Sequence, residues 1–246
     1  GGGGGGPAPV QTTVIFSGRA YPGSTVTLLK DAQVVATSIA GMDANFQLTL
    51  TNLSAGNFIF SLYGEDSKGN RSSLLTFPVG VTAGATTNVS GIFLAPTISV
   101  DKSEVKKGDD ITIFGQSLPN AQIIISVNSA NEVFVTTPVD KNGVYLYNLD
   151  TSVLELGSHL VKSKASLAAI NGGISGYSSA VGFRVGSTNV TALPKTSGGK
   201  ADVNTDGKVN LVDFSVVAYW YGRANPPAKA VAIFMKAGTS TSSVVR

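Results

Sequence analysis

The chain has 246 residues, of which 42% are hydrophobic and only 13% are charged, so it can bury a core and is not a disordered polymer. Its net charge of +3 is spread along the sequence without a Lys/Arg cluster, which argues against nucleic acid or an anionic membrane as a partner. The sequence contains no cysteine, which excludes disulfides, thiolate zinc sites and cysteine nucleophiles. No apolar stretch approaches the roughly 18–20 residues that a transmembrane helix needs.

The N-terminal residues 1–9 consist of six glycines followed by Pro-Ala-Pro. Glycine loses much entropy on ordering and proline lacks a backbone donor, so this segment is predicted to be a flexible spacer. The alternative is an extended arm that inserts into a neighbouring subunit. Because the sequence starts without Met or an apolar leader, we infer an export leader that was removed, and we expect an extracellular or cell-surface protein.

Short β-type runs separated by turn residues follow from residue 10. Thr25–Leu29 and Phe58–Tyr63 are examples of such runs, and Tyr21-Pro22-Gly23 is one of the turns between them. Strands of this length, with a turn about every 8–12 residues, are typical of antiparallel β-sandwiches. The sequence therefore predicts an all-β fold over this part of the chain.

The same succession of steps occurs twice. The pair Gly18/Pro22 recurs as Gly115/Pro119, and the Leu-x-x-Gly step that ends at Gly56 recurs at Gly157. Two diverged copies of one sandwich are therefore predicted, over residues 10–95 and 96–186, with a short connection between them. This double copy resembles the bacterial Ig-like domains that occur in tandem on secreted and cell-surface proteins, and the resemblance implies a spacer or adhesive architecture without catalytic residues.

Residues 187–200 are predicted to be a flexible linker, because they contain Pro194 and the pair Gly198-Gly199. The segment that follows, 202–213, is the one motif with chemistry. Side-chain oxygens recur at loop positions 1, 3, 5, 9 and 12, glycine occupies position 6, and position 7 offers its backbone carbonyl. In order, the predicted ligands are Asp202, Asn204, Asp206, Lys208 (through its carbonyl), Asn210 and Asp213. Oxygen donors at this spacing can wrap the six- to eight-fold shell of Ca²⁺, so calcium is the predicted cofactor.

A helix is predicted directly after this loop, because Leu211, Phe214, Ala218 and Tyr221 share one face and Gly222 can end it. The loop and exit helix, over 201–225, resemble one repeat of a type I dockerin module. That resemblance implies a protein partner, either a cohesin-like domain or a second copy of this chain. It assigns partner recognition to Leu211, Val212, Ala218, Tyr219 and Arg223. Since Leu211 and Val212 replace the small hydroxyl pair common in dockerins, a contact there would be apolar.

Dockerins carry two such repeats, but no Asp or Glu follows Asp213 here, and the tail 226–246 offers no second calcium loop. Three explanations stay open: a truncated or frame-shifted gene, a half-module that pairs with another chain, and a tail that adds a strand to a sheet. We favour pairing, because exposed aromatic side chains such as Trp220 tend to find a partner.

The sequence offers no catalytic constellation, and a non-catalytic protein is predicted. His159 is the only histidine, which leaves neither a Ser–His triad nor a histidine metal site, and most acids outside the loop occupy turns. The predicted fold class is all-β, with two tandem Ig-like antiparallel β-sandwiches and a small C-terminal calcium loop–helix, a half-dockerin. The predicted function is structural or adhesive, with a calcium-dependent docking module displayed at the cell surface. One alternative is a subunit of a self-assembling extracellular filament, which would be a homo-polymer. The other is a polysaccharide-binding accessory of a polysaccharide-degrading system.

Overall fold

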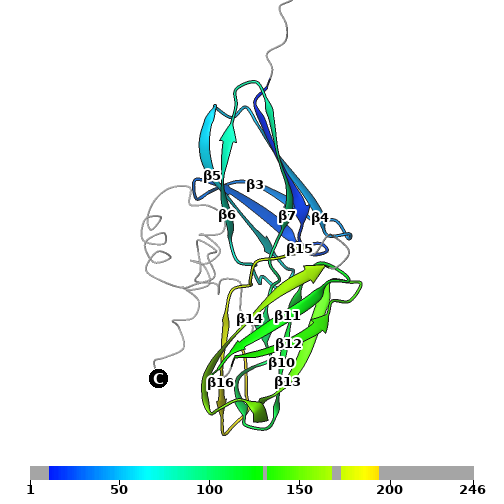
Figure 1. Cartoon of the computed structure of the whole chain (residues 1–246), viewed down its shortest axis with the longest axis vertical. Coiled ribbons are helices and arrows are strands. Elements are labelled where there is room, and N and C mark those ends of the chain that lie inside the picture. Colours follow the sequence, from blue (N-terminus) through cyan, green and yellow to red (C-terminus); the bar gives the residue numbers. More distant parts are fainter. Residues whose placement is uncertain (1–10, 130–131, 168–172, 194–246) are drawn as a thin grey trace, which may run out of the picture. The chain divides into compact units, whose positions relative to one another are not determined.

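The computed structural model describes residues 11–129, 132–167 and 173–193. These residues form strands, turns and one short 3₁₀ helix, which confirms the all-β fold class (Figure 1). The predicted N-terminal arm 1–9, the calcium loop and helix 201–225 and the tail 226–246 lie outside the described residues. The described part of the predicted linker contains a strand, β17 (Val190–Thr191), which pairs with a strand of the second sandwich.

The first sandwich consists of two sheets with the strand orders β4-β1-β7 and β3-β2-β5-β6. Its strands are β1 (Thr13–Arg19), β2 (Thr25–Lys30), β3 (Gln33–Ile39), β4 (Asn45–Thr51), β5 (Gly56–Glu65), β6 (Leu75–Val81) and β7 (Thr86–Phe93). All described pairs are antiparallel except β1 with β7, which run parallel.

The second sandwich has one sheet in the order β13-β10-β8 and a larger sheet in the order β12-β11-β14-β16-β9-β17, with β15 paired to β14. Its strands before the helix are β8 (Ser99–Val100), β9 (Lys102–Lys106), β10 (Asp110–Gln116), β11 (Gln122–Asn128), β12 (Val133–Pro138) and β13 (Val144–Asp150). The 3₁₀ helix η1 (Thr151–Val153) follows, and then β14 (Gly157–Leu167), β15 (Gly173–Ile174), β16 (Val181–Gly186) and β17. Asp150 caps η1 by accepting a hydrogen bond from the backbone N–H of Ser152.

The two sandwiches share one strand order and differ in how they are closed. The neighbours β4-β1 and β3-β2-β5-β6 of the first correspond to β13-β10 and β12-β11-β14-β16 of the second. Beside β1 lies β7, the last strand of the first sandwich, whereas beside β10 lies β8, the first strand of the second. The continuous stretch from β7 to β8 therefore closes one sandwich and opens the next.

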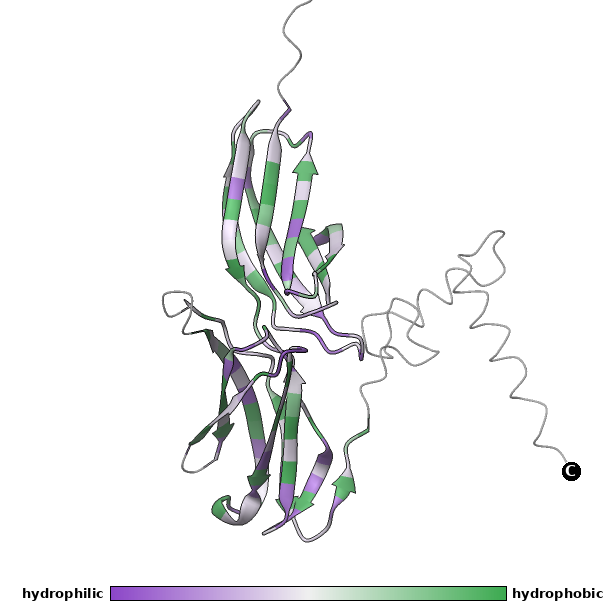
Figure 2. Cartoon of the chain, turned by 90° about the vertical axis from the view of Figure 1, so that its right-hand side faces the viewer, coloured by the Kyte–Doolittle hydropathy of each residue, from purple (hydrophilic) through white to green (hydrophobic). Residues whose placement is uncertain are grey.

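Hydrophobic and hydrophilic residues alternate along several strands (Figure 2), and this alternation turns the apolar side chains of one face toward the core. In β1, Val14 and Phe16 are buried, and in β10 Ile111 and Ile113 are buried, so the corresponding strands use the same faces. Each sandwich has its own core cluster. Ala44, from the turn between β3 and β4 of the first sandwich, nevertheless packs into the core cluster of the second.

The repeated glycines Gly18 and Gly115 mark the place where the closing stretch passes closest to the sheet. A Cβ atom on Gly18 would lie 2.1 Å from the carbonyl oxygen of Ile92, and one on Gly115 would lie 2.1 Å from that of Thr97. Both glycines stand at the corresponding point of β1 and β10, so the repeat in the sequence reflects the same backbone crossing in each sandwich.

We predict that Gly115→Ala lowers the free energy of unfolding by about 2 kcal/mol or more, because the obstructing atom is backbone and cannot swing away. Gly176→Ala is the matched control, since a Cβ at Gly176 meets nothing within 4 Å. Urea denaturation of both variants measures the difference. Equal stability of the two variants would contradict the close approach of the Thr97 backbone to Gly115.

Candidate functional site

The predicted calcium ligands and docking residues all fall in 201–225, outside the described residues, so their positions are not described here. In the part of the chain that is described, no group of three or more His, Asp or Glu side chains is placed to hold a metal ion. Within those same ranges, no helix is long and apolar enough to cross a membrane.

Acidic side chains of the sandwiches serve their own turns. Asp43 accepts a hydrogen bond from the backbone N–H of Asn45 (3.1 Å), and Asp140 accepts from the backbone N–H groups of Asn142 and Val144 (both 2.8 Å). The hydrogen bonds from Asn45, together with the charge of Arg19, lower the pKa of Asp43. These contacts are what Asx turns require.

The tyrosines of the sandwiches are largely used in packing. Tyr21 and Tyr145 are buried, and burial raises the pKa of both phenols far above its usual range. Arg71 Cζ lies 5.0 Å from the centre of the Tyr63 ring, and Lys162 Nζ lies 4.4 Å from the centre of the Tyr177 ring. This arrangement favours the core-packing interpretation over an exposed aromatic platform for a glycan.

His159 lies in β14 and is buried. Its Nε2 lies 2.9 Å from the carbonyl oxygen of Glu155, and its ring stacks on Phe183 with a centroid distance of 5.5 Å. These contacts join His159 to a backbone carbonyl and an aromatic ring, and neither partner is a nucleophile.

The connection between the two sandwiches is buried along its whole length. Residues 94–98 join β7 to β8, and every one of them is buried. Both sandwiches belong to one compact unit that ends at Leu193. A buried connection must have its backbone polar groups paired, which links the two sandwiches by hydrogen bonds as well as by packing.

Thr97 is the centre of that hydrogen-bond network. Its hydroxyl accepts from the backbone N–H of Gln116 (2.9 Å) and donates to Asp66 Oδ2 (3.2 Å). Its carbonyl oxygen accepts from the Tyr145 hydroxyl at 2.6 Å. One residue thereby connects the β5–β6 turn of the first sandwich to strands β10 and β13 of the second.

Asp66 is a buried carboxylate that is satisfied by neutral donors. The backbone N–H groups of Lys68 (2.9 Å) and Asn70 (2.8 Å) donate to its Oδ1, and the Asn70 amide donates to Oδ2 (3.0 Å). The same turn reaches the second sandwich again, because Ser99 Oγ donates to Asn70 Oδ1 (3.1 Å). We refer to Asp66, Asn70, Thr97, Ser99 and Tyr145 as the junction network.

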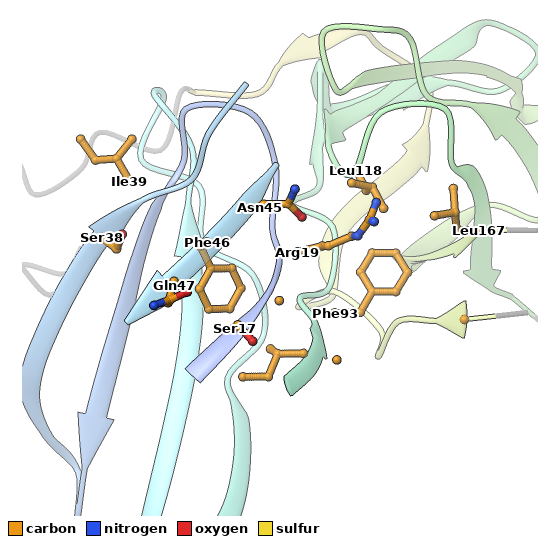
Figure 3. Close-up of a pocket in the computed structure, with 14 residues that line it drawn as sticks. Ser17, Arg19, Ser38, Ile39, Asn45, Phe46, Gln47, Phe93, Leu118 and Leu167 are labelled. Atoms are coloured by element: carbon orange, nitrogen blue, oxygen red, sulfur yellow. The ribbon is translucent and has the colours of Figure 1, made fainter. Parts of the chain in front are cut away.

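A groove lies beside the junction network, on the outward face of the sheet β4-β1-β7 (Figure 3). Among the described residues that line it, Arg19 is the only charged one, and Leu118 and Leu167 of the second sandwich also contribute to the lining. Sequence reasoning used Arg19 only as part of the repeated glycine–proline step. Alternation with the buried Phe16 could have placed it on the outward face, but not beside the second sandwich.

No protein-family model matches the sequence, and no curated protein sequence matches it either. Solved structures do resemble it. The tetra-tandem repeat in the extending region of a large adhesion protein matches 72% of this chain and 50% of its own length, at 19% identity and a TM-score of 0.32. A 1.5-MDa bacterial ice-binding adhesin matches 69% of this chain and 55% of its own length, at 17% identity and a TM-score of 0.27.

The fibronectin(III)-like modules of Clostridium thermocellum CbhA match 73% of this chain and 92% of their own length, at 15% identity and a TM-score of 0.27. The chain thus spans about half of the length of the first two structures. With identities and TM-scores this low, the likenesses carry no information about ligands or partners. The assignment of two tandem Ig-like sandwiches rests on the chain's own strand order.

We predict that Thr97→Val destabilises the protein by about 1–3 kcal/mol, because the change keeps the shape of Thr97 but removes a buried hydroxyl that serves two partners. Thr97→Ser, which retains the hydroxyl, is the control and should lose less. Thermal and urea unfolding measure both variants. A Thr97→Val protein as stable as the parent would show that the two hydrogen bonds of the Thr97 hydroxyl contribute nothing to stability.

Proposed function

We propose that this chain is a non-catalytic, exported structural or adhesive protein in which two Ig-like sandwiches hold a C-terminal calcium-dependent docking module away from a surface. The junction network is the observation that carries the spacer role. A flexible tether would need no buried connection, whereas residues 94–98 are enclosed and hydrogen-bonded to both sandwiches. A joint of this kind transmits force and position from one domain to the next.

The docking role is supported by the donor set of residues 202–213. Carboxylate, amide and carbonyl oxygens are the ligands that Ca²⁺ takes, and the glycine at position 6 suits the sharp turn of such a loop. Bound calcium would offset the repulsion among Asp202, Asp206 and Asp213 and couple the shape of the loop to the metal. Extracellular calcium, at about 1 mM, is sufficient to fill even a weak site of this class.

The partner of the module would contact Leu211, Val212, Ala218, Tyr219 and Arg223. This set is mostly apolar, with one cation and one phenol, so it suits a protein surface better than a free glycan. A cohesin-like domain and a second copy of this chain both meet that description.

We predict that the double change Asp202→Ala with Asp206→Ala abolishes calcium binding while leaving the sandwiches folded, because it removes two charged ligands and leaves the sequence of both sandwiches unchanged. Isothermal titration with CaCl₂ measures binding, and far-UV circular dichroism measures the fold. Asp43→Ala with Asp140→Ala is the matched control and should titrate as the parent does. Unchanged calcium binding in the double variant at 202 and 206 would refute the site.

Self-assembly into a filament is the second candidate, and strand β3 favours it. This strand pairs only with β2, carries no charged residue or proline, and exposes Val34 (61%) and Val35 (42%). Edge strands without charges or prolines are templates for pairing with another chain. Edge-to-edge pairing of β3 would not require calcium, which separates it from pairing through the half-dockerin.

We predict that light scattering over a wide concentration range detects association of the parent chain and that Val34→Lys reduces the part of it that persists in chelator. A lysine on β3 makes edge pairing unfavourable because its charge would have to be desolvated. Val153→Lys, at a residue of η1 that is 64% exposed and lies on no strand, is the matched control. A parent chain that stays monomeric with and without calcium would contradict self-assembly.

A further inference from the structure

The groove beside the junction network has the size and lining of a small-ligand site. It encloses about 700 Å³ and is bounded by the outward faces of β1, β4 and β7, by the end of β3 and by Leu118 and Leu167. Sites for small molecules commonly measure about 300–1,000 Å³ and combine apolar walls with a few polar groups. The groove shows this combination.

The position of Arg19 in the sheet gives the groove its chemistry. In the strand register, Arg19 stands directly between Asn45 of β4 and Phe93 of β7. A bulge between β1 and β7, next to Gly91 with its φ of +76°, brings Phe93 opposite Arg19. The sheet therefore presents an amide, a guanidinium and an aromatic ring in one row.

The Arg19 side chain has no hydrogen bond or ion pair with any of the described residues. It is half-buried, and Figure 3 shows its guanidinium directed toward Leu118 and Leu167. Asp43 is close enough for the charge of Arg19 to act on its carboxyl, but its oxygens are bonded to Asn45. A partly desolvated guanidinium that forms no ion pair with a described residue is poised for a carboxylate, which it can bind through two parallel hydrogen bonds.

The other polar groups of the groove are neutral. Ser17 and Gln47 face each other across β1 and β4, and Ser38 lies at the end of β3. Hydroxyl and amide side chains of this kind pair with alcohol groups, while Phe93 and Ile39 offer apolar contact to the face of a ring. None of the described residues that line the groove is acidic, so they offer no charged partner to a ligand's amino group.

We propose that this groove binds a hexuronic acid residue of an acidic polysaccharide, with the sugar carboxylate on Arg19, its hydroxyls on the Ser and Gln side chains and its ring against Phe93. The site is built at the junction and does not depend on the calcium module. An acidic peptide would satisfy Arg19 equally well, and its backbone groups could also bond the Ser and Gln side chains, but a hexuronic acid combines one carboxylate with hydroxyls that both donate and accept and with a ring face for Phe93. The carboxylate and the sugar hydroxyls are thus both part of the specificity.

The test is a titration of the full-length ¹⁵N-labelled chain with trigalacturonic acid, followed through the amide signals of Gly18, Gly91 and Phe93. A chelator is present throughout, so that neither the C-terminal loop nor calcium bound by the sugar contributes. We expect saturable shifts at millimolar ligand. The fully methyl-esterified trimer, which has the same hydroxyls without the charge, should bind about tenfold more weakly or worse.

Variants assign the effect to the groove. Arg19→Gln should weaken binding of the acid about tenfold or more, because it removes the cation and keeps a polar side chain of moderate size. Arg184→Gln, at an exposed arginine on β16 away from this groove, is the matched control and should bind as the parent does. Gln47→Ala should weaken the acid and its ester alike. Thermal unfolding establishes that each variant is folded.

Three results would overturn the proposal: no saturable shift, equal affinity for the ester, or unchanged affinity in Arg19→Gln. Equal affinity for a glutamate-rich peptide would overturn the sugar assignment in favour of a carboxylate peptide. If Arg19→Gln fails to fold, Arg19→Lys keeps the charge and the apolar stem and should lose only the bidentate part of the affinity. Whether or not these variants fold, the affinities of the parent chain for trigalacturonic acid and for its methyl ester show whether the ligand's carboxylates contribute to binding.

Discussion

The structure depends on the short segment that leaves β7 and enters β8. Thr97 of this segment lies against Gly115 of the second sandwich, and Ile92, near the end of β7, lies against Gly18 of the first, and at both crossings only a hydrogen fits. Because residues 94–98 are buried, their polar groups need partners, and Thr97 finds them in Asp66, Gln116 and Tyr145. The cost of enclosing the connection is thus offset by bonds that no isolated sandwich could form.

A joint of this construction has consequences for both sandwiches. The β5–β6 turn of the first is ordered around Asp66 by its own N–H groups and is also bonded to the linker, so the turn belongs to two domains at once. Ala44 enters the second core from the first sandwich. Loosening of one sandwich near the junction would therefore expose polar and apolar groups of the other, which suits a spacer that must hold its shape.

The Arg19 groove is a by-product of the same joint. Neither sandwich alone encloses it, since the sheet β4-β1-β7 supplies the polar row and the second sandwich supplies Leu118 and Leu167. The nearby leucines partly desolvate the guanidinium, and partial desolvation is what strengthens an ionic contact. A site formed between two domains in this way links ligand binding to the integrity of the joint.

The sequence by itself determined the all-β class, the two copies of a sandwich and the corresponding strands, because alternation and turn residues are local signals. It also supplies the whole calcium hypothesis, since the predicted ligands from Asp202 to Asp213 fall in one continuous stretch of sequence and are identified by their spacing alone. It could not reveal the junction network or the groove. Thr97, Asp66 and Tyr145, like Arg19 and Leu167, are distant in sequence, and only the packing of two complete sandwiches brings them together.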